Sequence, residues 1–216
     1  MNNVIKENIQ RWNELRNLEN GFKILNGGNV IGLSQMNFEQ MQINSSEFLH
    51  FYIGVTEETP EQQPIFYMVG NEYDIKEKID MHLDKVCALH FQPPPFFNIM
   101  PNTLNNTPDN IDINISAIRS FKWFLYKKDW FESAKNDNQV VRAFKIPIAS
   151  VKNIFNDTSV QNILIFFGIS WINTGYNIDL IFCNSTSEIF EIPEMFENLT
   201  MPCPPYNCGD FGLMNF

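Results

Sequence analysis

The chain of 216 residues has no apolar run long enough to cross a membrane. Its most apolar stretch, Ile163 to Ile172, has ten residues and includes Gly168 and Ser170, whereas a spanning helix needs roughly 20 apolar residues. The first residues, Met1 to Glu7, also lack the basic region and apolar stretch of a secretory signal. We therefore expect a soluble protein with no membrane association and a cytoplasmic location.

The sequence also lacks the common catalytic and nucleotide-binding motifs. It has no Gly-x-Ser-x-Gly elbow, no P-loop and no Gly-x-Gly-x-x-Gly fingerprint. The segment 26–29, Asn-Gly-Gly-Asn, is too short for such a motif and is typical of a turn. Because catalytic residues assemble in space, these absences leave enzymatic activity open while favouring a protein without one.

Potential metal ligands are few, with 4 cysteines and 3 histidines in the whole chain. Cys203 and Cys208 enclose four residues, of which Pro204 and Pro205 stiffen the connection. This spacing is at the outer limit of a zinc-binding pair. We predict no metal and no cofactor, and leave open whether the two thiols are free, bridged or metal-bound.

Basic residues are outnumbered, because 15 Lys and Arg stand against 25 Asp and Glu and give a formal net charge of −10. Such a field repels nucleic-acid phosphates and anionic lipid headgroups. We therefore predict no binding to nucleic acid or membrane, and a preference for a protein partner with a basic surface. The oligomeric state stays open.

Aromatic residues, in contrast, are abundant, with 20 Phe, 6 Tyr and 4 Trp. The chain is 44% hydrophobic and 19% charged, which is the composition of a globular protein. Because each ring buries a large apolar area, the rings are expected to supply much of the core.

Periodicity predicts several helices. The first is amphipathic, covers Val4 to Leu18, and is expected to end at Asn20-Gly21. Asp74 and Glu77 form a capping-box signature for a helix that ends near Lys85. We also predict a helix over Ser116 to Tyr126, and a further short helix that begins with a second capping box at Asp129 and Glu132.

Alternating apolar residues predict strands, and the clearest is Phe48 to Val55. We expect this strand to pair with Ile65 to Val69, and a single strand over Val140 to Ile146. Two further hairpins are expected at 22–33 and at 163–184. The pattern indicates an α+β fold with a predominantly antiparallel sheet built from hairpins and packed by several amphipathic helices.

One segment, 92–110, is dominated by Pro, Asn and Thr. Regular structure is not expected there, because proline fixes its own backbone and removes a hydrogen-bond donor. We favour a single domain over 1–216 with a long loop at 92–110. The alternative is two subdomains, 1–91 and 111–216.

The preferred candidate site is the connection between the two strands of the 163–184 hairpin. Trp171, Asn173, Tyr176 and Asn177 would form a binding surface there, because Trp and Tyr each offer a large apolar area and one polar group. The alternative is that Trp171 and Tyr176 form a cross-strand aromatic pair that stabilises the hairpin.

An alternative pocket would lie between the sheet face that carries His50 and Tyr52 and the 92–110 segment acting as a lid.

A third region, from Arg119 to Trp130, mixes basic and aromatic residues as binders of single-stranded nucleic acid do. The negative net charge argues against that activity. We interpret the segment as a helix with buried rings and a solvated lysine face.

These observations favour a non-enzymatic cytoplasmic binding or accessory protein that acts through a protein–protein surface. The alternative is a small-molecule-binding protein or enzyme with its pocket beneath the 92–110 loop.

Overall fold

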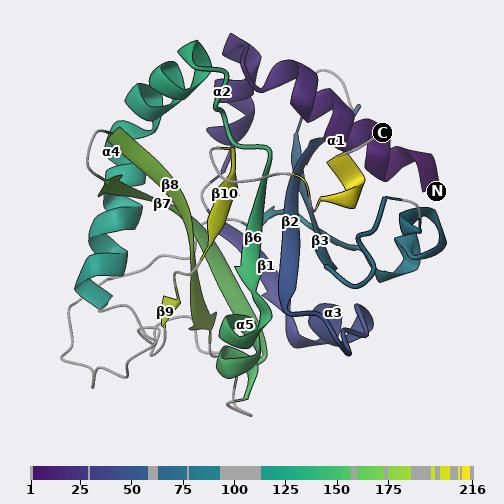
Figure 1. The fold of residues 1–216 in the computed structure, drawn as a ribbon. Helices are drawn as coiled ribbons and strands as arrows, with labels where there is room; N and C mark the ends of the chain where they lie inside the picture. The colour runs from purple at the N-terminus through teal and green to yellow at the C-terminus, as the bar shows by residue number, and fades with distance from the viewer. Residues whose placement is uncertain are drawn as a thin grey trace.

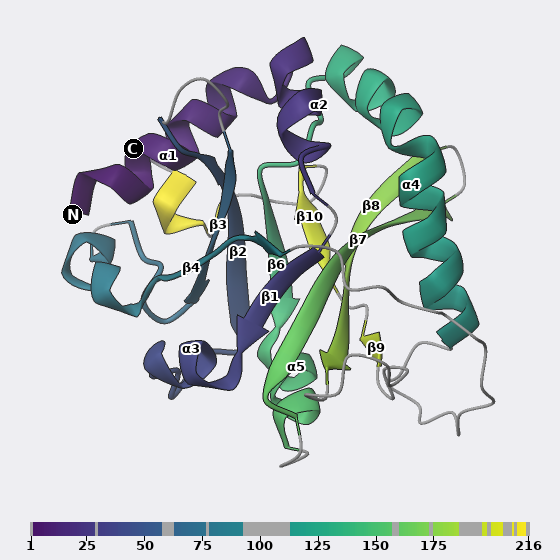
Figure 2. The same ribbon diagram turned by 180° about the vertical axis from the view of Figure 1, so that it is seen from behind.

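The computed structural model describes residues 2–28, 30–57, 63–76, 78–92, 113–156, 160–172, 175–185, 196–197, 200–204, 209 and 211–214. It has an α+β fold with two antiparallel sheets. The strand orders are β5-β1-β7-β8-β9 in one sheet and β10-β6-β2-β3-β4 in the other. The two sheets run at an angle to one another, with helices around them (Figures 1 and 2).

The second of these sheets is built around the predicted strand Phe48–Val55, which is β2 with the same bounds. It pairs with β3 (Pro64–Gly70) in the predicted hairpin, and on its other side with β6 (Ala143–Pro147). Two short strands, β4 (Cys87–Leu89) and β10 (Met201–Cys203), lie at the edges.

The first sheet is centred on the hairpin of β7 (Asn162–Ile172) and β8 (Gly175–Ser185), as predicted. β1 (Val30–Ser34) pairs with β7 and with β5 (Phe91–Gln92), while β9 (Phe196–Glu197) pairs with β8. Each sheet thus combines strands from both sides of the 92–110 segment, most of which lies outside the described residues.

The main hydrophobic core lies between the sheets. Leu49, Phe51, Ile53 and Val55, the apolar face predicted for β2, all belong to it. Phe167 of β7 meets this side, with its ring centroid 6.2 Å from that of Phe66 on β3. The composition therefore predicted correctly that aromatic rings would supply much of the core.

The amphipathic helix at the amino terminus is α1 (Asn2–Leu15), with Ile9 and Trp12 fully buried. The predicted stop at Asn20-Gly21 is wrong, because both residues lie inside α2 (Glu19–Leu25). Gly21 is required there for a different reason: a Cβ atom on it would lie 2.6 Å from the carbonyl oxygen of Arg16. The glycine permits close backbone approach between successive helices.

The predicted 22–33 hairpin is also wrong. Its first strand is the second half of α2, and its second strand, β1, pairs with β7 and β5 instead. The turn residues at 26–29 therefore connect a helix to a strand, because partners more than 100 residues away decide where β1 pairs.

The predicted helix from Asp74 to Lys85 is wrong as well. The described residues of this segment form only two short turns of 3-10 helix, Ile79–Met81 and Leu83–Lys85. Asp74 does not cap a helix, because its carboxylate is bound elsewhere in the fold, as described below.

The predicted helix at 116–126 is part of α4 (Ile113–Asn136), which packs mainly against β7 and is seen beside the β7–β8 hairpin in Figure 2. The second capping box does not start a new helix, because Asp129 and Glu132 lie within α4. Two shorter helices, α3 (Gln35–Gln40) and α5 (Ile148–Phe155), follow β1 and β6 directly. The last described element is the 3-10 turn η3 (Gly212–Met214), which contacts α1.

Candidate functional site

α4 is apolar on two sides, and this property makes it the leading candidate site. Its inner side carries Trp123 and Trp130, which are buried, with ring centroids 5.6 Å apart. Trp123 also lies 5.0 Å from the ring of Phe167 on β7. These rings secure α4 to the main core.

The outer side of α4 carries four large apolar side chains that are more than half exposed. They are Ile118 (53%), Phe121 (61%), Phe124 (62%) and Leu125 (51%). Ile118, Phe121 and Leu125 are spaced i, i+3 and i+7, so they form one row along the helix, with Phe124 beside it. We call these four residues the α4 outer surface.

The expectation that the rings of this segment are buried is therefore only half right. Trp123 and Trp130 are buried, whereas Phe121 and Phe124 face solvent. Of the lysines, Lys128 is exposed as expected, whereas the Nζ atom of Lys127 lies 5.6 Å from the centroid of the Phe124 ring. Partial burial lowers the pKa of Lys127.

The α4 outer surface continues toward the β7–β8 hairpin through a pair of tyrosines. The ring of Tyr126, at the edge of this surface, stacks on that of Tyr176 of β8 with centroids 5.7 Å apart and an interplanar angle of 22°. Two of the predicted features, the hairpin and the basic-aromatic segment, therefore meet in one region.

A polar bridge also joins the hairpin to α4. Arg119 of α4 lies 3.5 Å from the carboxylate of Asp179, which is buried and accepts a hydrogen bond of 3.0 Å from the side chain of Asn177. Opposite Asp179 stands Gly168. A Cβ atom there would lie 2.7 Å from Cδ1 of Ile181 on β8 and 3.3 Å from the Cβ atom of Arg119, so the glycine leaves room for both side chains.

The four residues predicted to form a binding surface on the hairpin do not all have the same surroundings in the structure. Trp171 and Tyr176 are direct partners in the β7–β8 ladder, as in the cross-strand alternative. Tyr176 is half-buried against α4, and Asn177 supports Asp179. The side chain of Trp171 and the whole of Asn173 lie outside the described residues.

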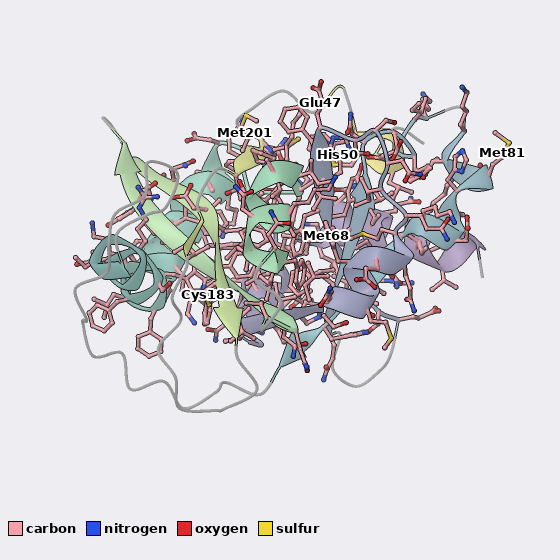
Figure 3. The ribbon with its side chains drawn as sticks, turned by 90° about the horizontal axis from the view of Figure 1, so that it is seen from below. Glu47, His50, Met68, Met81, Cys183 and Met201 are labelled. Carbon is pink, nitrogen blue, oxygen red and sulfur yellow. The ribbon has the colours of Figure 1, made fainter. Side chains whose placement is uncertain are left out.

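The alternative pocket residues, His50 and Tyr52, lie in the interior (Figure 3 labels His50). The His50 side chain is only 1% exposed, and Tyr52 is fully buried. A ring nitrogen of His50, Nδ1, lies 2.5 Å from Oδ2 of Asp74, and the Tyr52 hydroxyl donates a hydrogen bond to the same oxygen. Burial and the neighbouring Asp74 carboxylate raise the pKa of Tyr52 well above its usual range.

The carboxyl-terminal turn closes this cluster of His50, Tyr52 and Asp74. The backbone N–H of Leu213 donates a hydrogen bond of 2.9 Å to Oδ1 of Asp74, and the ring of Phe211 lies 4.2 Å from that of His50. The remaining ring nitrogen of His50, Nε2, is buried and has no hydrogen-bond partner among the described residues. The predicted lid at 92–110 lies largely outside those residues.

The described residues contain no group of three or more His, Cys, Asp or Glu side chains arranged to hold a metal ion. Cys203 is disulfide-bonded, whereas Cys87 and Cys183 are free thiols. Of the predicted pair, Cys208 lies outside the described part of the chain. Burial raises the pKa of the Cys87 thiol to about 11 and that of Cys183 further, which reduces the fraction of reactive thiolate at both.

Sequence reasoning missed two elements of these sites. The hydrogen bond from the backbone of Leu213 to Asp74 joins residues 139 positions apart, and no local sequence pattern predicts it. The row of Ile118, Phe121 and Leu125 fits the helix predicted over Ser116 to Tyr126, but its exposure was missed, although it lies opposite Trp123 and Trp130 on a helical projection.

No known protein family, curated protein or solved structure matches this chain. Among the described residues, no helix is both long enough and apolar enough to span a membrane.

Proposed function

We propose that this protein is a non-enzymatic binding or accessory protein that acts through a protein–protein surface on α4. The observation that carries the proposal is the exposure of Ile118, Phe121, Phe124 and Leu125 on one continuous stretch of helix. A contiguous exposed apolar patch is unusual on a monomeric protein and is typical of an interaction site.

The α4 outer surface is held in place by contacts with the rest of the protein, which makes it suitable for binding a partner protein. The helix that displays it is secured to β7 by Trp123 and to the hairpin by the stacked Tyr126 and Tyr176. A rigid support lowers the entropy lost on binding, because few elements must become ordered when the partner docks. Aromatic side chains are the usual anchors of such interfaces.

The alternative function, a small-molecule enzyme that uses His50 and Tyr52, has weaker support. Asp74 already binds both side chains and the backbone of Leu213. A substrate that reached His50 from the side of the carboxyl-terminal turn would have to displace the ring of Phe211.

Capture from extract of the source cells tests the proposal, with the double variant Phe121→Ser/Leu125→Ser as the surface variant. A matched control is Met36→Ser/Met81→Ser, because both methionines are exposed and lie away from α4. We expect proteins captured by the wild type and the control to be lost with the surface variant. Truncation of one hot-spot residue costs about 2 kcal/mol, or roughly thirtyfold in affinity.

Folding of each variant is checked by urea unfolding. Recovery of the same proteins by all three forms would show that the α4 outer surface is not the binding site.

A cytoplasmic location belongs to the same proposal. The disulfide at Cys203 is the observation against it, because cytosolic thiols are normally kept reduced. Trapping of free thiols in intact cells, followed by mass spectrometry of the peptide containing Cys203, decides the point. A fully oxidised Cys203 would contradict the proposed location.

A further inference from the structure

The α4 outer surface lies in the most basic part of an acidic protein. Residues 113–128 of α4 contain four cations, Arg119, Lys122, Lys127 and Lys128, whereas the carboxylates of the helix, Asp129 and Glu132, follow in its last two turns, where Glu132 pairs with Lys135. The whole chain, in contrast, has a formal net charge of −10. The charge beside this surface is therefore opposite in sign to that of the whole protein.

Two of the four cations already have a role within the fold. Arg119 pairs with Asp179 and secures the hairpin, and Lys127 lies over the ring of Phe124. Lys122 and Lys128 differ, since neither has a carboxylate within ion-pair distance in the described part of the chain. Both flank the row of Ile118, Phe121 and Leu125 on the helix surface.

We propose that the α4 outer surface binds an acidic amphipathic helix of a partner protein. This inference rests on the function proposed above and specifies the partner. A row with spacing i, i+3 and i+7 extends about 10 Å along the axis of α4. It is complementary to a second helix with the same spacing, whose carboxylates would reach Lys122 and Lys128.

The net negative charge, which by itself favours a basic partner, repels a short acidic helix less than it repels a larger polyanion. A nucleic acid or an anionic membrane presents many negative charges to the whole protein, whose field repels them. A single helix presents only a few carboxylates, and these lie within about one Debye length of the lysines at physiological salt. We therefore expect the local attraction to the lysines to exceed the repulsion by more distant charges.

Two fluorescent 20-residue peptides test the proposal in titrations of the full chain. Both have Leu and Phe at helical i, i+3, i+4 and i+7 spacing, and they differ only in Glu or Lys at the flanking positions. We expect the Glu peptide to bind about tenfold more tightly, which corresponds to about 1.4 kcal/mol. Its affinity should fall as salt is added.

Charge reversal provides the matched control. The variant Lys122→Glu/Lys128→Glu should lose or reverse the preference for the Glu peptide. The variant Lys76→Glu/Lys152→Glu, which makes the same change in net charge at exposed residues outside α4, should retain it. Phe121→Ser should abolish binding of the Glu peptide.

Several results would overturn the inference. Equal binding of the two peptides would show that the lysines do not select the partner. Tighter binding to phosphatidylserine vesicles or to a single-stranded oligonucleotide would assign the surface to a different class of ligand. Sedimentation that detects a wild-type dimer and a Phe121→Ser monomer would assign it to a second copy of this chain.

The two proposals can fail separately. If neither peptide binds while Phe121→Ser/Leu125→Ser still loses proteins captured from the extract, the acidic helix is wrong and the protein-binding function stands. If capture is unaffected by that variant, the protein-binding function itself fails.

Discussion

Two regions of the molecule depart from the usual rule that polar groups face solvent and apolar groups lie inside. They are the cluster of His50, Tyr52 and Asp74, and the α4 outer surface. The cluster places polar side chains in the interior. The α4 outer surface places large apolar side chains in solvent. Each arrangement is unfavourable unless another group compensates for it.

The two regions differ in where that compensation comes from. Asp74 accepts hydrogen bonds from Tyr52 and from Leu213 of the same chain. The Nδ1 atom of His50 also lies within hydrogen-bonding distance of its carboxylate. Within the described residues, nothing equivalent covers Ile118, Phe121, Phe124 and Leu125, which remain more than half exposed. This difference is the basis for the proposal that the α4 outer surface is a binding site, whereas the cluster is expected to stabilise the fold.

The largest effect on stability is expected from Asp74→Ala. This change leaves buried hydrogen-bond donors of Tyr52 and Leu213 without an acceptor, and should lower the free energy of unfolding by about 3–5 kcal/mol. Urea unfolding followed by tryptophan fluorescence measures the loss. The control is Asp80→Ala, whose exposed carboxylate pairs with Lys6 and should contribute at most about 1 kcal/mol.

An equal loss in the two Asp variants would mean that the cluster is not a stabilising network. If the Asp74→Ala protein folded but no longer captured the proteins that the wild type captures, the cluster would also take part in binding.

An intermediate effect is expected from Tyr52→Phe. The lost hydrogen bond to Asp74 should cost about 1–2 kcal/mol at pH 7. Because burial raises the pKa of Tyr52 in the folded protein, the unfolded chain loses this proton first, at about pH 10. The wild type should therefore lose stability as pH rises above about 10, while the variant lacks this contribution.

The difference between wild type and Tyr52→Phe should accordingly become smaller from pH 9 to pH 11 in urea unfolding. A difference that stayed constant or increased over this range would contradict the buried, protonated state of Tyr52.

The smallest effect on stability is expected from Phe121→Ser. Its ring is 61% exposed, so the free energy of unfolding should change by no more than about 0.5 kcal/mol. Thermal and urea unfolding measure this change, with Met36→Ser as a control at another exposed apolar residue. A loss above about 2 kcal/mol would show that the ring is covered within the protein, and would remove the basis of the proposed interface.

Local patterns predicted the fold best where a segment has one dominant face. β2 was predicted with its observed bounds because its alternating residues separate cleanly into an apolar face and a mixed face. The β7–β8 hairpin was predicted from the β-branched and aromatic residues of its strands and from the turn residues between them. Prediction failed at 22–33, where β1 pairs with the distant strand β7, and at 74–85, where Asp74 binds the backbone of Leu213.

The candidate site was only partly predictable. Tyr176 and Asn177 were predicted as part of a binding surface on the hairpin, and that role stays a prediction; their contacts with α4 and Asp179 were not foreseen. The basic and aromatic residues of α4 were recognised as a group. Which of its rings face outward depends on how the helix is rotated against β7, and local periodicity did not decide this.

The sequence by itself determined the α+β composition, the aromatic core, the central hairpins and the contrast between a basic helix and an acidic chain. These properties follow from residue type and short-range spacing. Only the tertiary structure decided the partners of β1, the burial of His50 beneath the carboxyl-terminal turn, and the exposure of Phe121 and Phe124. Each of these depends on packing between segments far apart in the chain, where the burial of apolar area overrides local preference.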